Sequence, residues 1–271
     1  MYYMNLYISI EVISLLSFIL FALLCFTRIE NNTDINKVVY IFSLFFLATI
    51  GLIHYLFVLN NVSNKLALVT SLLILIIFIS FLVLSIFSYQ FIRLRILFIP
   101  FLLVILIARC LIGISSVGDK NEIQLFENKF LLLHIVTSLF SYSLITISLV
   151  TSFCTFIQSV QIKKMKYNKV VNDFLPSMYE SEILAIRFLY LTILFLIISL
   201  LSGLYYFIET GEELIYFFNE KVLFSLLTLI LTLLIITVRN LRGLSGQMVF
   251  KMILLSYLLI SFSYFGIRLM G

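Results

Sequence analysis

Long apolar runs separated by short polar segments dominate the chain from one end to the other. An α-helix rises about 1.5 Å per residue, so about 20 apolar residues are enough to cross the hydrocarbon core of a bilayer. The runs that reach about this length number eight: residues 6–27, 38–59, 66–88, 96–114, 130–157, 186–208, 222–238 and 248–268. The pattern predicts an all-α polytopic membrane protein with eight transmembrane helices in a single domain, residues 1–271.

The composition excludes a soluble fold. Of the 271 residues, 63% are hydrophobic and 11% are charged, and the mean hydropathy is +1.19. In a soluble domain, about a quarter of all residues are charged. A soluble fold of this length would expose more surface than so few polar side chains can cover. The net charge of +5 is small and gives no indication of nucleic-acid binding.

The positions of Lys and Arg predict how the helices are oriented, because cytoplasmic loops carry an excess of these residues. The loops after odd-numbered helices, with their flanks, hold twelve of them, whereas the loops on the other side hold five. We therefore expect both termini outside the cytoplasm (N-out/C-out), in a multi-pass protein of the inner (plasma) membrane. The acidic residues agree, since these fall in the expected outer loops: Asp119, Glu122, Glu127, Glu209, Glu212, Glu213 and Glu220.

The largest inner loop is expected to hold a basic run and a helix start. The run KKMKYNK is typical of a topology anchor that meets anionic headgroups. The segment LPSMYESEILAIRFLY that follows places Glu180 and Glu182 in a first helical turn, with Ser177 as the expected N-cap. We expect this helix to lie along the inner surface before it bends into the sixth span.

Two histidines, His54 and His134, lie inside expected spans, where an ionisable side chain costs several kcal/mol unless it is paired or functional. With the predicted topology, His54 lies about 9 Å and His134 about 7 Å below the outer boundary. Two neutral imidazoles at one depth on different helices are what axial ligation of a haem iron requires. His54 and His134 are therefore candidate metal ligands, with Arg109 and Lys221 as candidate partners of the haem propionates.

The same residues also allow a purely structural interpretation. In that case Arg109 pairs with Glu11, and each histidine bonds to a neighbouring hydroxyl. One face of the expected fifth helix carries a stripe of small polar residues and one histidine: His134, Ser138, Ser141, Ser148 and Ser152. This stripe predicts a packing seam against another helix, with the histidine facing into the bundle. The three cysteines form no CxxC pair, which excludes a zinc ribbon and a thioredoxin-type redox pair.

Three segments resemble a known family. The segment LLLHIVTSLFSYSLITISLVTSF is similar to part of the CcsA/CcmC-type cytochrome c assembly family, and most similar to the eight-helix inner-membrane branch represented by YpjD and HemX. Two further segments are similar to the same branch, namely LPSMYESEILAIRFLYLTILFLIISLLSGLYYF and the region from Asn219 to Gly266. The resemblance is therefore strongest over about 131–268. His54 matches a histidine often found in its second helix.

The resemblance implies haem handling in a bacterial membrane, coupled to cytochrome assembly or to control of haem synthesis. This chain departs from the family pattern at three points. It has no Trp, whereas assembly members carry a Trp-rich outer loop that docks haem. Glu220 and Asn240 stand where the branch commonly has histidines, so only His54 and His134 remain.

We therefore expect a non-enzymatic membrane protein that binds haem b between His54 and His134 near the outer face. The alternative is a cofactor-free membrane adaptor or regulator that partners a haem-synthesis or cytochrome-assembly enzyme. A transporter is disfavoured because no pair of Gly/Pro-broken helices occupies matching halves of the chain. A membrane enzyme is disfavoured because no nucleophile with a positioned base is evident.

Overall fold

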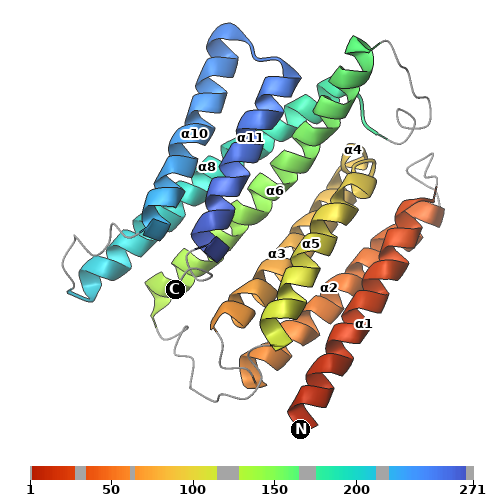
Figure 1. The fold of residues 1–271 in the computed structure, drawn as a ribbon, viewed down its shortest axis with the longest axis vertical. Coiled ribbons are helices and arrows are strands. Elements are labelled where there is room, and N and C mark those ends of the chain that lie inside the picture. Colours follow the sequence, from red (N-terminus) through yellow and green to blue (C-terminus); the bar gives the residue numbers. More distant parts are fainter. Residues whose placement is uncertain are drawn as a thin grey trace. The chain divides into compact units, whose positions relative to one another are not determined.

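The computed structural model describes residues 2–27, 35–61, 65–114, 128–164, 175–211 and 220–266. These segments are helical with short turns and contain no strand. The elements, labelled in Figure 1, are α1 (Tyr2–Cys25), α2 (Ile35–Asn61), α3 (Lys65–Phe87), α4 (Tyr89–Ile92), α5 (Arg95–Ile114), α6 (Lys129–Lys163), α8 (Met178–Glu209), α10 (Glu220–Arg242), α11 (Gly246–Ser261) and the π-helix η1 (Phe262–Gly266).

The protein is an all-helical, multi-pass membrane protein, as predicted. Among the described residues, seven helices are long and apolar enough to cross a membrane. The fourth expected span corresponds to α5, whose apolar part, Arg95–Ile107, is shorter. The count of eight spans and the N-out/C-out orientation stay predictions. Five of the acidic residues assigned to outer loops lie outside the described residues, namely Asp119, Glu122, Glu127, Glu212 and Glu213.

The helices group into two compact units, Met1–Ile123 and Gln124–Gly271, each described here by itself. In the first unit, α1 packs on α2, α2 on α3, α3 on α5, and α5 back on α1, so the four helices form a closed bundle. Its interior includes a cluster of three aromatic rings, Phe81, Phe91 and Phe98, with centroids 4.1–5.7 Å apart. The prediction of a single domain stays a prediction.

Arg95 lies in a segment that the sequence predicts to be an inner loop, but its side chain is buried inside the first unit. Its guanidinium donates to the carbonyl oxygens of Cys25, Thr27 and Ile92. A helix C-terminus leaves carbonyl groups without intrahelical partners and carries partial negative charge. Arg95 therefore caps the C-terminal end of α1 in addition to contributing to the charge bias.

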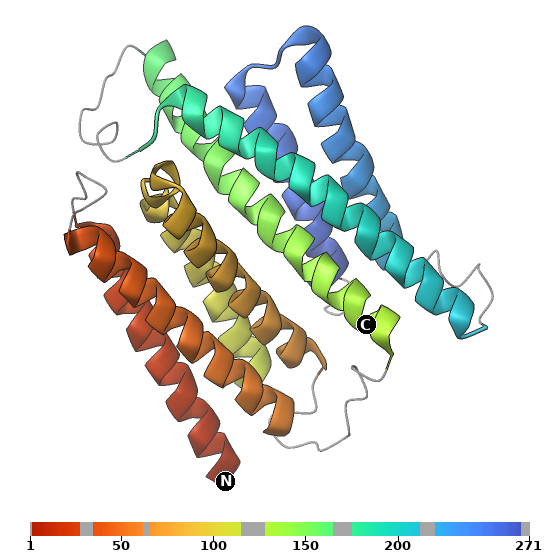
Figure 2. The same ribbon diagram turned by 180° about the vertical axis from the view of Figure 1, so that it is seen from behind.

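The second unit is also a closed four-helix bundle, in which α6 packs on α8, α8 on α10, α10 on α11, and α11 on α6. Helices α6 and α8 lie side by side along most of their length (Figures 1 and 2). The expected packing seam of α6 is confirmed at Ser148, whose hydroxyl donates to the Ala185 carbonyl oxygen of α8 at 2.9 Å. Small side chains along α6 let the two backbones approach closely.

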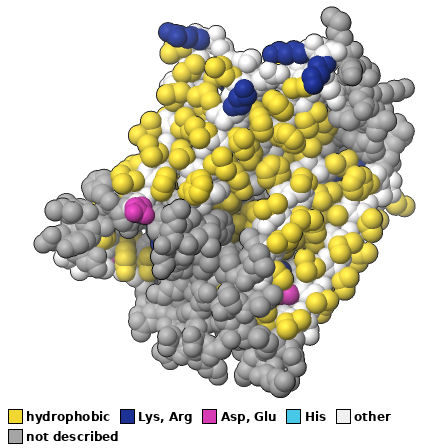
Figure 3. Space-filling model, viewed as in Figure 1, with side chains coloured by type: hydrophobic (Ala, Val, Ile, Leu, Met, Phe, Trp, Pro, Cys, Tyr) yellow, Lys and Arg dark blue, Asp and Glu magenta, His cyan; other side chains and the backbone are white. Residues whose placement is uncertain are grey.

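Charge is segregated within the second unit. Figure 3 shows hydrophobic side chains over α10 and α11, with Lys and Arg at the end where α10 finishes and α11 begins. There Arg239 pairs with Glu182 at 3.1 Å, and Lys163 donates to Gln247 at 2.8 Å. At the other end, where α6 begins and α8 finishes, Asn128 donates to Glu209 at 3.2 Å. The basic end is the one predicted to face the cytoplasm.

The prediction that this helix bends between the inner surface and the sixth span is wrong. Residues from Met178 to Glu209 form one uninterrupted helix of 32 residues, about 48 Å long, which exceeds the hydrocarbon thickness of about 30 Å. No proline lies within it, and its first glycine is Gly203, so nothing in the sequence interrupts its first turns. The predicted helix start is confirmed, because Ser177 and Glu180 form a reciprocal capping box.

Replacing Ser177 with alanine should loosen the start of α8. The hydroxyl accepts from the Glu180 amide, and the Glu180 carboxylate accepts from the Ser177 amide, so the substitution removes half of the box. Loss of an N-cap costs about 1 kcal/mol. We expect faster hydrogen exchange at the first amides of α8 in Ser177→Ala, measured by mass spectrometry, and unchanged exchange in α6. Equal exchange at these amides in both proteins would contradict the cap's role.

Candidate functional site

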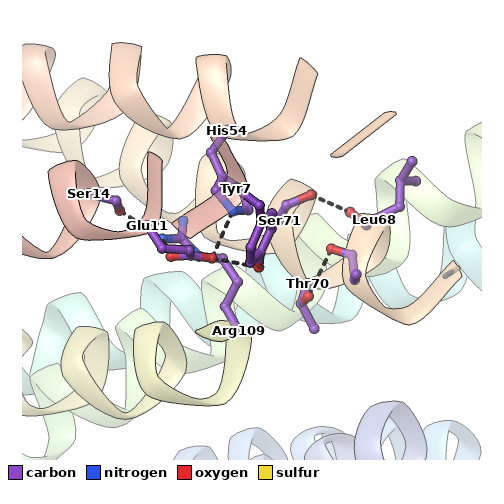
Figure 4. A network of polar contacts seen from close by, with 9 residues as sticks. Tyr7, Glu11, Ser14, His54, Leu68, Thr70, Ser71 and Arg109 are labelled. Atoms are coloured by element: carbon purple, nitrogen blue, oxygen red, sulfur yellow. Dashed lines mark hydrogen bonds and ion pairs between the residues drawn. The ribbon is translucent and has the colours of Figure 1, made fainter. Parts of the chain in front are cut away.

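A buried polar cluster lies in the first unit, against α1. Tyr7, Glu11 and Ser14 are spaced four and three residues apart, so they share one face of α1. This face meets His54 from α2 and Arg109 from α5, and Figure 4 shows the five side chains converging. Glu11, His54 and Arg109 are only 3%, 1% and 2% exposed. The three ionisable groups are thus enclosed by protein.

The carboxylate of Glu11 is the centre of the cluster. Its Oε1 accepts from the Tyr7 hydroxyl and from Nε2 of His54, each at 2.8 Å. Its Oε2 accepts from Nη2 of Arg109 at 2.6 Å, and the same Nη2 donates to the Ser14 hydroxyl at 2.7 Å. A guanidinium and a carboxylate this close form a charge-assisted pair that offsets the cost of burying either charge alone.

These contacts leave one nitrogen of His54 unsatisfied. Because a carboxylate oxygen paired with a guanidinium only accepts, Nε2 of His54 carries the proton. Nδ1 is then a bare lone pair, and it is buried without a hydrogen-bond partner among the described residues. A buried polar atom without a partner costs about 1–3 kcal/mol, so its retention calls for an explanation. A ligand that accepts electron density from Nδ1 would supply one.

His134 is held by α8 in the second unit. Its Nδ1 lies 2.7 Å from the carbonyl oxygen of Ser199 and 3.2 Å from the hydroxyl of the same residue. A carbonyl oxygen only accepts, so Nδ1 carries the proton and Nε2 keeps its lone pair. Gly203, one turn further along α8, lets the ring approach closely, because a Cβ there would lie 2.9 Å from Nδ1. The expectation that His134 points into the helix bundle is confirmed.

The geometry of His134 fits an axial ligand of haem. Metal-ligating imidazoles almost always donate their second ring nitrogen to a carbonyl or carboxylate, which fixes the tautomer and raises ligand basicity. His134 donates from Nδ1 to Ser199, so the lone pair that a metal would take is on Nε2. In the described part of the chain, no three His, Cys, Asp or Glu side chains gather as a metal cluster.

His54 fits the same role less directly, because its Nε2 is engaged by Glu11 and its Nδ1 is enclosed by side chains. Ligation through Nε2 requires the bond to Glu11 to break, and ligation through Nδ1 requires neighbouring side chains to move. The structure describes His54 and His134 in separate units, so their joint ligation of one iron stays a prediction.

The two candidate propionate partners differ in availability. The structural interpretation expected Arg109 to pair with Glu11, and this pairing is confirmed. The expected hydroxyl partner was found for His134 in Ser199, whereas His54 bonds to a carboxylate. Lys221 is exposed at the start of α10. Its role toward a propionate stays a prediction.

Four residues that shape these sites were not identified from the sequence, although their spacing carried a signal. Tyr7 and Ser14 flank Glu11 at helical spacing on the face that carries the charge. Ser199 and Gly203 form a pair of small residues four positions apart, a spacing typical of close helix contacts in membranes. Both signals identify which face of a helix is used, and neither identifies the partner helix.

Comparison with known proteins assigns the family. A sequence model of the family described as "Cytochrome C assembly protein" matches residues 43–271. The chain is 30% identical over 139 residues to an uncharacterized 28.8 kDa protein in the nifR3-like 5' region of Azospirillum brasilense, over 50% of this chain and 49% of that one. It therefore spans about half the length of this curated relative. No solved structure matches. The chain belongs to the cytochrome c assembly protein family, whose membrane proteins handle haem.

Proposed function

We propose that this chain is a non-enzymatic haem-binding protein of the bacterial inner (plasma) membrane, in the YpjD/HemX-like branch of its family. His134 and His54 are the proposed axial ligands of haem b. The observation that carries the proposal is the state of His134, which donates Nδ1–H to the Ser199 carbonyl, so that its lone pair is on Nε2. Family membership supplies the reason to expect haem as the group that uses it.

The residues around His134 are arranged to hold a ligand. Bound haem would supply a ferric or ferrous iron that takes an imidazole nitrogen. The Ser199 carbonyl orients the ring, and Gly203 leaves the space that this orientation needs. Lys221 is the second residue of α10, and its carbonyl oxygen accepts from the Ser263 hydroxyl of η1, which ties the start of α10 to the segment after α11. It is the proposed propionate partner in this unit, and Arg109 is the one in the first unit.

The departures from the family pattern limit what is proposed. Without Trp, and with Glu220 and Asn240 at positions where the branch commonly has histidines, the chain lacks residues that the resemblance associates with haem transfer. In the structure, Asn240 donates to the Tyr190 hydroxyl at 3.3 Å. We therefore propose haem retention, with a cytochrome-assembly or haem-synthesis protein as the partner, and not transfer to an apocytochrome.

Absorption spectroscopy of the detergent-purified protein tests this function. Supplied with haemin, the protein should take up haem and show, once reduced, the sharp visible bands of six-coordinate b-type haem. His134→Ala and His54→Ala should each lose these bands. Ser141→Ala, a buried position in the same stripe of α6, is the matched control and should keep them.

Two results would contradict the proposal: absence of a Soret band after haem supply, or a spectrum that both histidine substitutions leave unchanged. A protein that takes up no haem, and still co-purifies with a haem-synthesis or cytochrome-assembly enzyme when both histidines are replaced, would be the cofactor-free adaptor.

A further inference from the structure

The chain contains two histidines, and the structure holds them by opposite ring nitrogens. Nε2 of His54 faces the Glu11 carboxylate, whereas Nδ1 of His134 faces the Ser199 carbonyl. Both oxygens are acceptors, so each fixes the proton on the nitrogen it contacts. The free lone pair is therefore on Nδ1 in His54 and on Nε2 in His134.

We propose that Glu11 is a positioning residue for His54, which it holds in the Nε2–H tautomer so that Nδ1 is the nitrogen left for a ligand. This inference rests on the proposed function for its purpose, but the tautomer itself is a property of the protein without haem. It adds a residue from α1 to a site that the sequence assigned to α2 and α6.

The arrangement around Glu11 is built to keep its carboxylate ionised and immobile. Arg109 neutralises its charge through Oε2, which leaves Oε1 to accept from His54. Tyr7 donates to Oε1 as well and packs against the imidazole edge-on, with ring centroids 5.7 Å apart. Ser14 accepts a hydrogen bond from Arg109. Each neighbour of Glu11 thus contributes either to the position of the carboxylate or to the position of the ring.

The tautomer has a consequence for iron binding. His134 offers the lone pair of Nε2, whereas His54 offers that of Nδ1, next to the point where the ring joins the chain. A histidine that donates its other nitrogen to a carboxylate is a more basic ligand than one that donates to a carbonyl oxygen. The two ligands are therefore inequivalent, and Glu11 is the residue that makes them so.

Nitrogen NMR of the haem-free protein in lipid bilayers tests the proposal. With ¹⁵N-labelled imidazoles the spectrum contains two rings, and His134→Gln removes one of them to give the assignment. In each ring, a protonated nitrogen and a bare nitrogen resonate in well-separated regions. We expect His54 to show a protonated Nε2 and a bare Nδ1, and His134 to show the reverse. Two rings in the same tautomer, or a doubly protonated His54, would overturn the proposal.

A double variant separates positioning by Glu11 from a general structural effect. Glu11→Leu together with Arg109→Met removes both charges, so no unpaired ion is left buried. We expect His54 to lose its single tautomer and His134 to keep its signals, which also shows that the second unit is folded. Ser14→Ala is the matched control and should leave both rings unchanged. A His54 that keeps a single Nε2–H tautomer in the double variant would refute the role of Glu11.

These measurements are made without haem, so their outcome is independent of the haem-binding test. If the protein takes up no haem but its histidines show the expected tautomers, the proposed function is removed and the positioning role of Glu11 stays in place. If the protein takes up haem but His54 shows the other tautomer, the positioning role is removed and the proposed function stays in place.

Discussion

Replacing Arg109 with methionine is expected to destabilise the first unit by about 3–5 kcal/mol, because it leaves the Glu11 carboxylate buried without a counter-charge. Arg109 is 2% exposed and donates to both Glu11 and Ser14, so no solvent replaces the lost contact. In a bilayer an unpaired ion is several kcal/mol less stable than in water. Tyr7 and His54 still donate to Glu11, but neither is an obligate cation.

The measurement is reversible unfolding in mixed detergent micelles, followed by circular dichroism. The double variant Glu11→Leu/Arg109→Met should recover most of the lost stability, since a neutral apolar pair often replaces a buried ion pair at little cost. Ser14→Ala, which removes a neutral contact of the same guanidinium, should cost far less. If Arg109→Met unfolds at the same detergent fraction as the unsubstituted protein, the ion pair does not stabilise the fold.

Replacing Gly203 with alanine is expected to have the second-largest effect, and to act on His134. The added Cβ would lie 2.9 Å from Nδ1 and 3.1 Å from Cε1, so the ring must leave the Ser199 carbonyl. Overpacking of this kind costs about 1–3 kcal/mol. Loss of the group that orients a metal-binding histidine lowers metal affinity by about 10–100-fold. We expect both effects in Gly203→Ala, the second measured by haemin titration.

Gly51 provides the matched control. A Cβ at this position on α2 meets Phe78 at 3.4 Å, which a small adjustment of that ring accommodates. Gly51→Ala should therefore keep haem affinity close to that of the unsubstituted protein. Unchanged haem affinity in Gly203→Ala would show that the close contact between His134 and α8 is not needed for ligand binding.

The sequence predicted the membrane-embedded part of the fold well, because apolar length and charge alone decide which segments enter a bilayer. It predicted the start of α8 from its capping residues, but it predicted the end of α6 poorly. Helix α6 continues to Lys163, beyond the apolar run of 130–157. Helix continuity outside the hydrocarbon depends on capping and on the absence of breakers, which hydropathy does not report.

The candidate site was predictable only in part. The pairing of Arg109 with Glu11 followed from the cost of burying single charges, and it is present. The contact between His54 and the same carboxylate was not predicted, because a sequence does not specify how α1 and α2 are rotated toward each other. For the same reason the sequence did not identify Ser199 of α8 as the partner of His134.

Electron paramagnetic resonance of the ferric, haem-loaded protein is the most direct test of two-histidine ligation. A low-spin spectrum typical of two imidazole ligands is expected for the unsubstituted protein. His54→Ala and His134→Ala should each convert it to a high-spin spectrum, and Ser141→Ala should not. A high-spin spectrum in the unsubstituted protein, or a low-spin spectrum that persists in either histidine variant, would contradict haem ligation by His54 and His134.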